Sequence, residues 1–213
     1  MIINRNLFIL SIGQIFSFTS PTVTVLLSGI IGSQLIKINY LATFPTALMI
    51  VGTAIGAPLA SKIMEVKGRK FGFIYSSLLN SFSSLLCAYA ISISSFSFFC
   101  LGNIFIGLSV SFALQYRFAV TELVQKENIP KAISLILLLG IVAALLGSNI
   151  VSFTKDLFIT EYAGSYISLS LLTIVPFFFF LFYNGDSGFN IQKRNNKKSI
   201  SNLLSNKHIQ LAI

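Results

Sequence analysis

The sequence predicts an all-α integral membrane protein, a bundle of six transmembrane helices, and three observations lead to this prediction. Of the 213 residues, 54 % are hydrophobic and only 10 % are charged, whereas soluble domains carry about 25 % charged residues. Six apolar runs reach the roughly 20 residues that a helix needs to cross a bilayer. Lys and Arg are concentrated in alternate loops and in the C-terminal tail. Because hydrocarbon satisfies no backbone hydrogen bonds, such long runs are expected to be helices.

The six predicted spans follow one another with short connections. They cover residues 6–31, 40–63, 71–93, 96–118, 132–153 and 163–183. The first run resembles a signal peptide, but it continues to Ile31 without a small-residue cleavage site, so we expect it to be the first helix. We therefore predict a membrane domain over residues 1–184. Residues 185–213 are predicted to form a cytoplasmic basic linker that leads to a truncated seventh helix.

The positions of Lys and Arg predict the orientation, since cytoplasmic loops carry the excess of positive charge. With the N-terminus inside, thirteen of the 15 Lys and Arg lie on the cytoplasmic side, and Lys37 and Lys155 lie outside. Both termini are therefore expected in the cytoplasm. The net charge of +9 reflects this asymmetry and does not indicate nucleic-acid binding, because the basic residues sit between apolar spans.

A polar stripe runs along the first predicted helix at steps of three and four residues, which places its members on one face. Its members are Gln14, Ser17, Pro21, Thr24 and Ser28. The hydroxyl groups could satisfy backbone carbonyls freed by Pro21 and hold this helix against a neighbour. Alternatively, the stripe lines a hydrated cavity.

The fourth predicted helix repeats this pattern. Its polar and small residues on one side are Asn103, Gly107, Ser111 and Arg117. Arg117 lies about one turn inside the cytoplasmic edge, where an unpaired charge costs roughly 2.5 to 3.5 kcal/mol unless it reaches the interface. Either snorkelling or a functional role is consistent with this position.

Small residues form two further strips that favour close helix packing. Gly52 and Gly56 lie on the second helix, and Gly140 and Gly147 lie on the fifth. We expect these glycines to contact the backbones of neighbouring helices. A partner that lies outside the six spans could also fill one of these strips.

A charged stretch at residues 58–70 connects the second and third spans. Gly68 permits a tight turn, and Glu65 can cap it or pair across it. Arg69 can reach a carboxylate at the foot of a neighbouring helix, for which Glu122 is the obvious candidate. On the simpler interpretation, Lys67, Arg69 and Lys70 only follow the distribution of positive charge on the cytoplasmic side.

This connecting loop resembles the loop signature of the major facilitator superfamily, between its second and third helices. The matching residues are Pro58, Glu65, Gly68, Arg69 and Lys70, while Ser61 and Val66 depart from the usual glycine and arginine. Residues 116–119, 132–134 and 140–147 also resemble a bacterial branch of this superfamily. The resemblance implies the N-terminal six-helix half of a transporter in the bacterial cytoplasmic membrane.

By this resemblance, Glu65, Arg69 and Glu122 form a charge relay that locks the outward-facing state. The superfamily places its substrate site between two six-helix halves. We therefore expect a lipid bilayer, an unknown small-molecule substrate and a second half supplied in cis, in trans or by a homodimer. The expected function is secondary-active transport by alternating access; the alternative is a truncated or structural membrane protein without transport activity.

Enzyme chemistry is not expected from this sequence. His208 is the only histidine, and no Asp or Glu lies deep within a predicted span. Cys87 and Cys100 show neither CxxC spacing nor a His partner, so we expect core packing and no metal. No phosphate-binding GxxxxGK[ST] motif is present, and no cofactor is expected.

Overall fold

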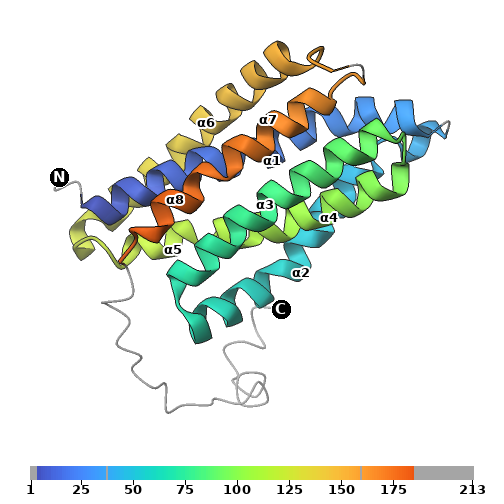
Figure 1. Cartoon of the computed structure of the whole chain (residues 1–213). Coiled ribbons are helices and arrows are strands. Elements are labelled where there is room, and N and C mark those ends of the chain that lie inside the picture. Colours follow the sequence, from blue (N-terminus) through green and yellow to red (C-terminus); the bar gives the residue numbers. More distant parts are fainter. Residues whose placement is uncertain (1–3, 37, 159, 185–213) are drawn as a thin grey trace, which may run out of the picture.

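The computed structural model describes residues 4–36, 38–158 and 160–184, and these form a bundle of helices (Figure 1). The helices are α1 (Arg5–Leu35), α2 (Phe44–Lys67), α3 (Arg69–Ser92), α4 (Phe96–Ala113), α5 (Tyr116–Thr121), α6 (Ile129–Thr154), α7 (Ala163–Thr173) and α8 (Val175–Leu181). Two short 3-10 helices, η1 (Asn39–Leu41) and η2 (Lys126–Asn128), precede α2 and α6. Among the described residues, six stretches are long and apolar enough to cross a membrane, as the sequence predicts.

Two of the six spans are built from two helices each. The fourth consists of α4 and α5 in the stretch Phe96–Thr121, and the sixth consists of α7 and α8 in the stretch Ala163–Leu181. Pro176 stands in the first turn of α8, where its missing N–H interrupts the hydrogen bonding that would continue α7. By contrast, α1 passes through Pro21 without a break.

The connection between the second and third spans differs from the predicted loop. Helix α2 continues through Pro58 to Lys67, and α3 begins at Arg69. Gly68 is therefore the whole turn, and Glu65 lies in the last turn of a helix instead of in a loop. The sequence pattern missed this because charged residues can continue a helix once it leaves the hydrocarbon core.

The helices pack in neighbouring pairs around two clusters of buried apolar residues. Helix α2 runs along α4, α3 lies between α4 and α7, and α1 packs against α6 (Figure 1). One core cluster, near the α2–α3 turn, contains Phe73, Tyr116 and Phe180. A second, further along the bundle, contains Val23, Cys87 and Tyr166.

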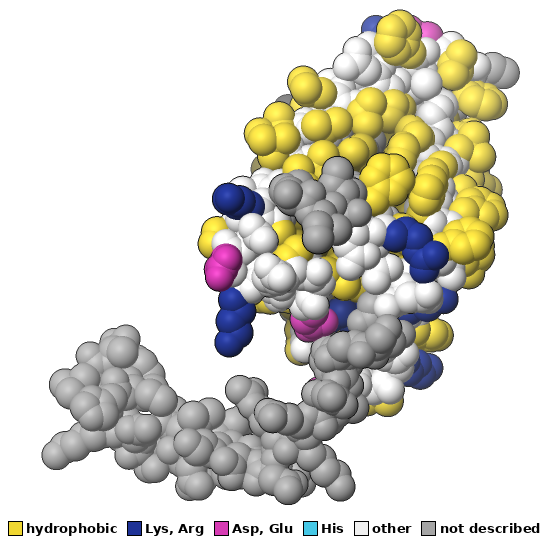
Figure 2. Space-filling model, turned by 90° about the vertical axis from the view of Figure 1, so that its left-hand side faces the viewer, with side chains coloured by type: hydrophobic (Ala, Val, Ile, Leu, Met, Phe, Trp, Pro, Cys, Tyr) yellow, Lys and Arg dark blue, Asp and Glu magenta, His cyan; other side chains and the backbone are white. Residues whose placement is uncertain are grey.

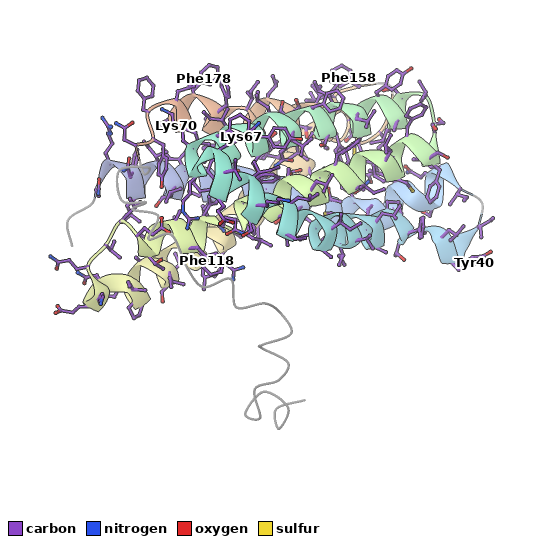
Figure 3. The ribbon with its side chains drawn as sticks, turned by 90° about the horizontal axis from the view of Figure 1, so that it is seen from below. Tyr40, Lys67, Lys70, Phe118, Phe158 and Phe178 are labelled. Carbon is purple, nitrogen blue, oxygen red and sulfur yellow. The ribbon has the colours of Figure 1, made fainter. Side chains whose placement is uncertain are left out.

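Both described ends of the chain lie at one end of the bundle. The backbone N–H of Asn184 donates to Oδ1 of Asn6, with 3.2 Å between nitrogen and oxygen. The labelled Lys70 and Phe118 lie toward one end, and Tyr40 lies at the other (Figure 3). This arrangement agrees with an even number of spans. The predicted linker and seventh helix, residues 185–213, lie outside the described residues.

Apolar side chains cover much of the surface, as expected for a protein in lipid. In the face that Figure 2 shows, hydrophobic side chains dominate the upper part, and several Lys and Arg lie on the lower part. Helices α2 and α6 are the least buried of the six spans. Their outward residues include Ile50, Ile55, Leu138, Ile141 and Leu145.

Candidate functional site at the basic end of the bundle

The candidate site begins at the turn that Gly68 makes between α2 and α3. Its backbone has φ 86° and ψ 159°, a conformation that residues with a Cβ atom rarely adopt. The N–H of Gly68 donates to the carbonyl oxygen of Met64 at 3.0 Å and closes the end of α2. This tight turn places Arg69 in the first turn of α3, facing the end of the fourth span.

Arg69 forms a two-pronged ion pair with Glu122, the carboxylate expected from the sequence. Its Nε donates to Oε2 at 2.9 Å, and its Nη2 donates to Oε1 at 2.5 Å. The Arg69 side chain is 12 % exposed and that of Glu122 is 33 % exposed. Paired hydrogen bonds of this kind fix orientation as well as distance. The pair therefore joins the start of α3 to the residue that follows α5.

In the described part of the chain, no ion pair joins the other charged residues of the predicted loop to Arg69 or Glu122. Glu65 is exposed, and no ion pair links it to another residue in the described part of the chain. The ammonium of Lys67 lies 4.6 Å from the centre of the Phe71 ring, a cation–π contact. Lys70 is partly exposed on the first turn of α3 (Figure 3). The structure thus brings together two members of the expected three-residue relay.

Arg117 lies on α5 at the same end of the bundle. Its side chain is partly exposed, and it takes part in no ion pair with any residue in the ranges that the structure describes. The neighbouring Tyr116 is fully buried, and its hydroxyl lies 3.0 Å from Oγ of Ser17. The Tyr116 side chain is thus enclosed in the bundle, while the Arg117 side chain is partly open to the surroundings.

The polar stripe of the first span faces the interior of the bundle. Gln14, Ser17, Thr24 and Ser28 are all buried, and Pro21 is partly buried. The amide of Asn80 on α3 donates to the carbonyl oxygen of Ser17 at 3.3 Å, and Ser28 hydrogen-bonds Thr46 of α2. The stripe therefore contacts neighbouring helices of the same bundle.

The polar residues of the fourth span are also internal. Asn103 and Ser111 are buried, and each hydrogen-bonds a carbonyl oxygen of its own helix. Gly107 lies against α2, where an added Cβ atom would stand 2.0 Å from the carbonyl oxygen of Met49. The proposal that these residues line a solute cavity requires them to become exposed when the helices move.

The glycines expected to serve packing lie between helices. A Cβ atom added to Gly52 would stand 2.3 Å from the carbonyl oxygen of Ile104, so α2 and α4 approach too closely for a side chain there. Gly56 faces Ser111 on the same pair of helices. Gly147 meets Val23 of α1, whereas Gly140 has more room, with Gln14 at 3.6 Å.

Helix α3 carries polar residues that the sequence analysis did not single out. Ser76 donates to the carbonyl oxygen of Ser109, and Ser81 donates to that of Ser170, each at 3.0 Å. The recurrence of Ser and Asn at steps of three and four residues over 76–84 is the signal that could have identified this face. Together these bonds join α3 to α4 and α7.

Within the part of the chain that the structure describes, no three His, Cys, Asp or Glu side chains lie close enough to share a metal ion. Cys87 and Cys100 are free and buried. The fold and the ion pair thus define a multi-pass helical membrane protein with a charged junction at one end.

Comparison with known proteins finds bacterial transporters. The chain is 32 % identical to the riboflavin transporter RfnT of Brucella anthropi over 172 residues, which are 80 % of this chain and 43 % of that protein. It is 24 % identical to the uncharacterized MFS-type transporters YdeG and YddS of Bacillus subtilis, over 71 % and 95 % of this chain and 35 % and 49 % of those proteins. No family model and no solved structure matches.

The chain belongs to the major facilitator superfamily of membrane transporters. It spans less than half the length of each of these curated relatives. The described bundle of six spans agrees with one half of such a transporter.

Proposed function

We propose that this chain supplies the N-terminal half of a secondary-active transporter that moves a small solute by alternating access. The observation that carries the proposal is the ion pair between Arg69 and Glu122, at the Gly68 turn. The pair joins two spans at one end of the bundle, whereas polar contacts in the described interior, such as those of Asn80 with Ser17 and Ser76 with Ser109, are neutral hydrogen bonds. A charged junction of this kind can open and close without repacking the core.

In this proposal the basic end of the bundle faces the cytoplasm of a bacterium. The turn between α2 and α3 carries Lys67, Arg69 and Lys70, and the excess of Lys and Arg marks the cytoplasmic side. Asn6 and Asn184 lie at the same end, so both termini would be cytoplasmic. The membrane would be the cytoplasmic (inner) membrane.

A second six-helix half would complete the transporter, in cis, in trans or as a second copy of the chain. The relatives are more than twice as long as the part that this chain matches. Helices α2 and α6 offer the least buried apolar faces for such a half. On α6, the exposed Ser148, Asn149 and Ser152 hydrogen-bond carbonyl oxygens of their own helix, so this face is compatible with an apolar partner.

The solute path would lie between the two halves. Ser11 and Thr22 of α1 and Gln115 beyond α4 are polar and partly exposed in this conformation. Movement of the halves would add buried stripe residues, including Gln14, Ser17, Asn103 and Ser111. The similarity to RfnT makes riboflavin the first solute to test.

Uptake of labelled riboflavin tests the proposal, in bacteria that can neither synthesise nor import riboflavin. The chain is expressed alone and together with the C-terminal half of RfnT, with each half alone as a control. Riboflavin uptake above the empty-vector level in either arrangement supports the proposal. If neither arrangement raises uptake although both halves reach the membrane, riboflavin transport is excluded and the same cells are tested with a panel of other solutes.

The variant Arg69→Ala distinguishes transport through this chain from leakage. We expect uptake to fall about tenfold, which corresponds to a barrier for the transport cycle that is higher by about 1.4 kcal/mol. The matched control is Lys67→Ala, since Lys67 contacts Phe71 and not Glu122. Equal uptake in both variants would exclude the ion pair as a gate. A non-transporting membrane protein is the alternative function, and it is favoured if no solute is taken up in any pairing.

A further inference from the structure

Six polar side-chain atoms in the interior of the bundle have no hydrogen-bond partner among the described residues. They are the hydroxyl oxygens of Ser20, Thr24, Ser84 and Tyr166 and the amide oxygens of Asn80 and Asn103, which we call the internal polar site. Each of these side chains is at most 2 % exposed. An unpaired polar group costs more when it is buried than a hydrogen bond contributes when it forms. Six such groups in one bundle therefore require partners.

The six residues come from four helices that meet in one region. The amide nitrogen of Asn80 on α3 bonds the carbonyl oxygen of Ser17 on α1. The amide nitrogen of Asn103 on α4 lies 4.0 Å from Sγ of Cys87 on α3. Ser20 and Thr24 are one turn apart on α1, and Asn80 and Ser84 are one turn apart on α3, so each pair shares a face.

Tyr166 of α7 completes the convergence. Its hydroxyl faces that of Thr24, too far away for a hydrogen bond of normal geometry, and Cys87 is also close. Its ring packs edge-on against Phe99 of α4, with ring centres 5.8 Å apart. Contacts through one part of the interior therefore link the residues of α1, α3, α4 and α7 that carry these atoms.

The hydroxyl groups of this site differ from others on the same helices. Thr19 donates to the carbonyl oxygen of Ile15 at 2.9 Å, and Ser77 donates to that of Phe73 at 3.2 Å. Such bonds to the preceding turn are the usual way for a hydroxyl to be satisfied within a helix. Ser20, Thr24 and Ser84 make no such bond. Their hydroxyl groups are therefore left without a partner inside the described bundle.

We propose that the internal polar site binds ordered water molecules, which bridge α1, α3, α4 and α7. Buried water bonds two to four otherwise unsatisfied polar groups, and hydroxyl and amide oxygens supply both the donors and the acceptors that water needs. A cation would require charge compensation, and α1, α3, α4 and α7 contain no Asp or Glu. This inference does not depend on the proposed transport function.

Radiolytic footprinting of the purified full chain in lipid nanodiscs tests the proposal. An X-ray pulse converts bound water into hydroxyl radicals, which modify adjacent side chains whatever their exposure. Tyr166 is the probe, and Tyr116 is the matched control, because both are fully buried but the Tyr116 hydroxyl is bonded to Ser17. We expect Tyr166 to be modified severalfold faster than Tyr116. Equal rates for the two tyrosines would overturn the proposal.

The variant Thr24→Val provides a second, independent measurement. It preserves the shape of the side chain and removes one hydroxyl group from the site. If water is bound there, modification of Tyr166 slows severalfold and the variant unfolds at a lower temperature. If the site is dry, the removal of an unpartnered hydroxyl raises the unfolding temperature and leaves labelling unchanged, which would refute the proposal. If the variant does not fold, the comparison of Tyr166 with Tyr116 in the chain without substitutions decides whether water is bound.

Discussion

The ion pair between Arg69 and Glu122 should contribute measurably to stability, and a double-mutant cycle measures its contribution. The variants are Arg69→Gln, Glu122→Gln and the combination of both. The pair makes two short, charge-assisted hydrogen bonds, and each bond to a charged group is worth about 1.5 to 3 kcal/mol in stability. Solvent screening reduces this value, since exposed pairs contribute only about 0.2 to 1 kcal/mol.

The exposure of the two side chains places the pair between these limits. Arg69 is 12 % exposed and Glu122 is 33 % exposed, so we expect a coupling free energy of about 1 to 2 kcal/mol. The coupling should decrease in about 1 M salt, where the screening length falls to about 3 Å.

Unfolding can be followed through the two cysteines. The chain contains no Trp, but Cys87 and Cys100 are free and buried, so a thiol-reactive fluorophore reports unfolding as SDS is added to mixed micelles. The control cycle pairs Lys67→Gln with Glu122→Gln and should be additive within about 0.5 kcal/mol. If the Arg69 and Glu122 variants are also additive within about 0.5 kcal/mol, the ion pair makes no measurable contribution to stability.

Three further predictions concern packing and backbone geometry, each measured by the same unfolding assay. Gly68→Ala should cost about 1 to 3 kcal/mol because its φ of 86° strains any residue with a Cβ atom, and an unchanged stability would show that the turn relaxes. Gly107→Ala should lower the free energy of unfolding by at least about 1 to 3 kcal/mol, since its new Cβ atom would meet the carbonyl oxygen of Met49. The matched control Gly140→Ala, with 3.6 Å of clearance from Gln14, should be neutral or stabilising by about 1 kcal/mol; equal losses in the two variants would contradict the packing argument. Phe180→Ala should lower the free energy of unfolding by about 3 to 5 kcal/mol, because this fully buried ring packs on Phe73 and Tyr116. A loss below about 1 kcal/mol would mean that the surrounding side chains fill the cavity.

Several local features were predicted correctly from the sequence because they depend on composition over short distances. The six spans agree with the apolar stretches of the described residues, within a few residues at most ends. The turn at Gly68 was also expected, because glycine readily adopts the backbone angles of tight turns. The extent of α2 was not, because hydropathy falls at Lys62 and Glu65 while the helix continues to Lys67.

The direction in which polar faces point was less accessible to sequence reasoning. The stripe on the first span was recognised, but its spacing is equally consistent with a cavity wall and with contacts inside the bundle. The structure turns it toward α2 and α3, through the bonds of Ser28 and Ser17. The polar residues of α3 were overlooked, although they include Asn80 and Ser81.

The six helical spans that cross a membrane follow from the sequence alone, because the transfer of each segment into lipid depends on its own length and side chains. The sequence also predicts that Arg69 stands at a glycine turn. The packed bundle was needed to show that Arg69 meets Glu122 while Glu65 stays exposed, and that the stripe from Gln14 to Ser28 is enclosed. These outcomes depend on the rotation and spacing of each helix. Rotation and spacing are set by contacts such as that of Gly107 with Met49, because these two residues are distant in the sequence and meet only when the helices pack.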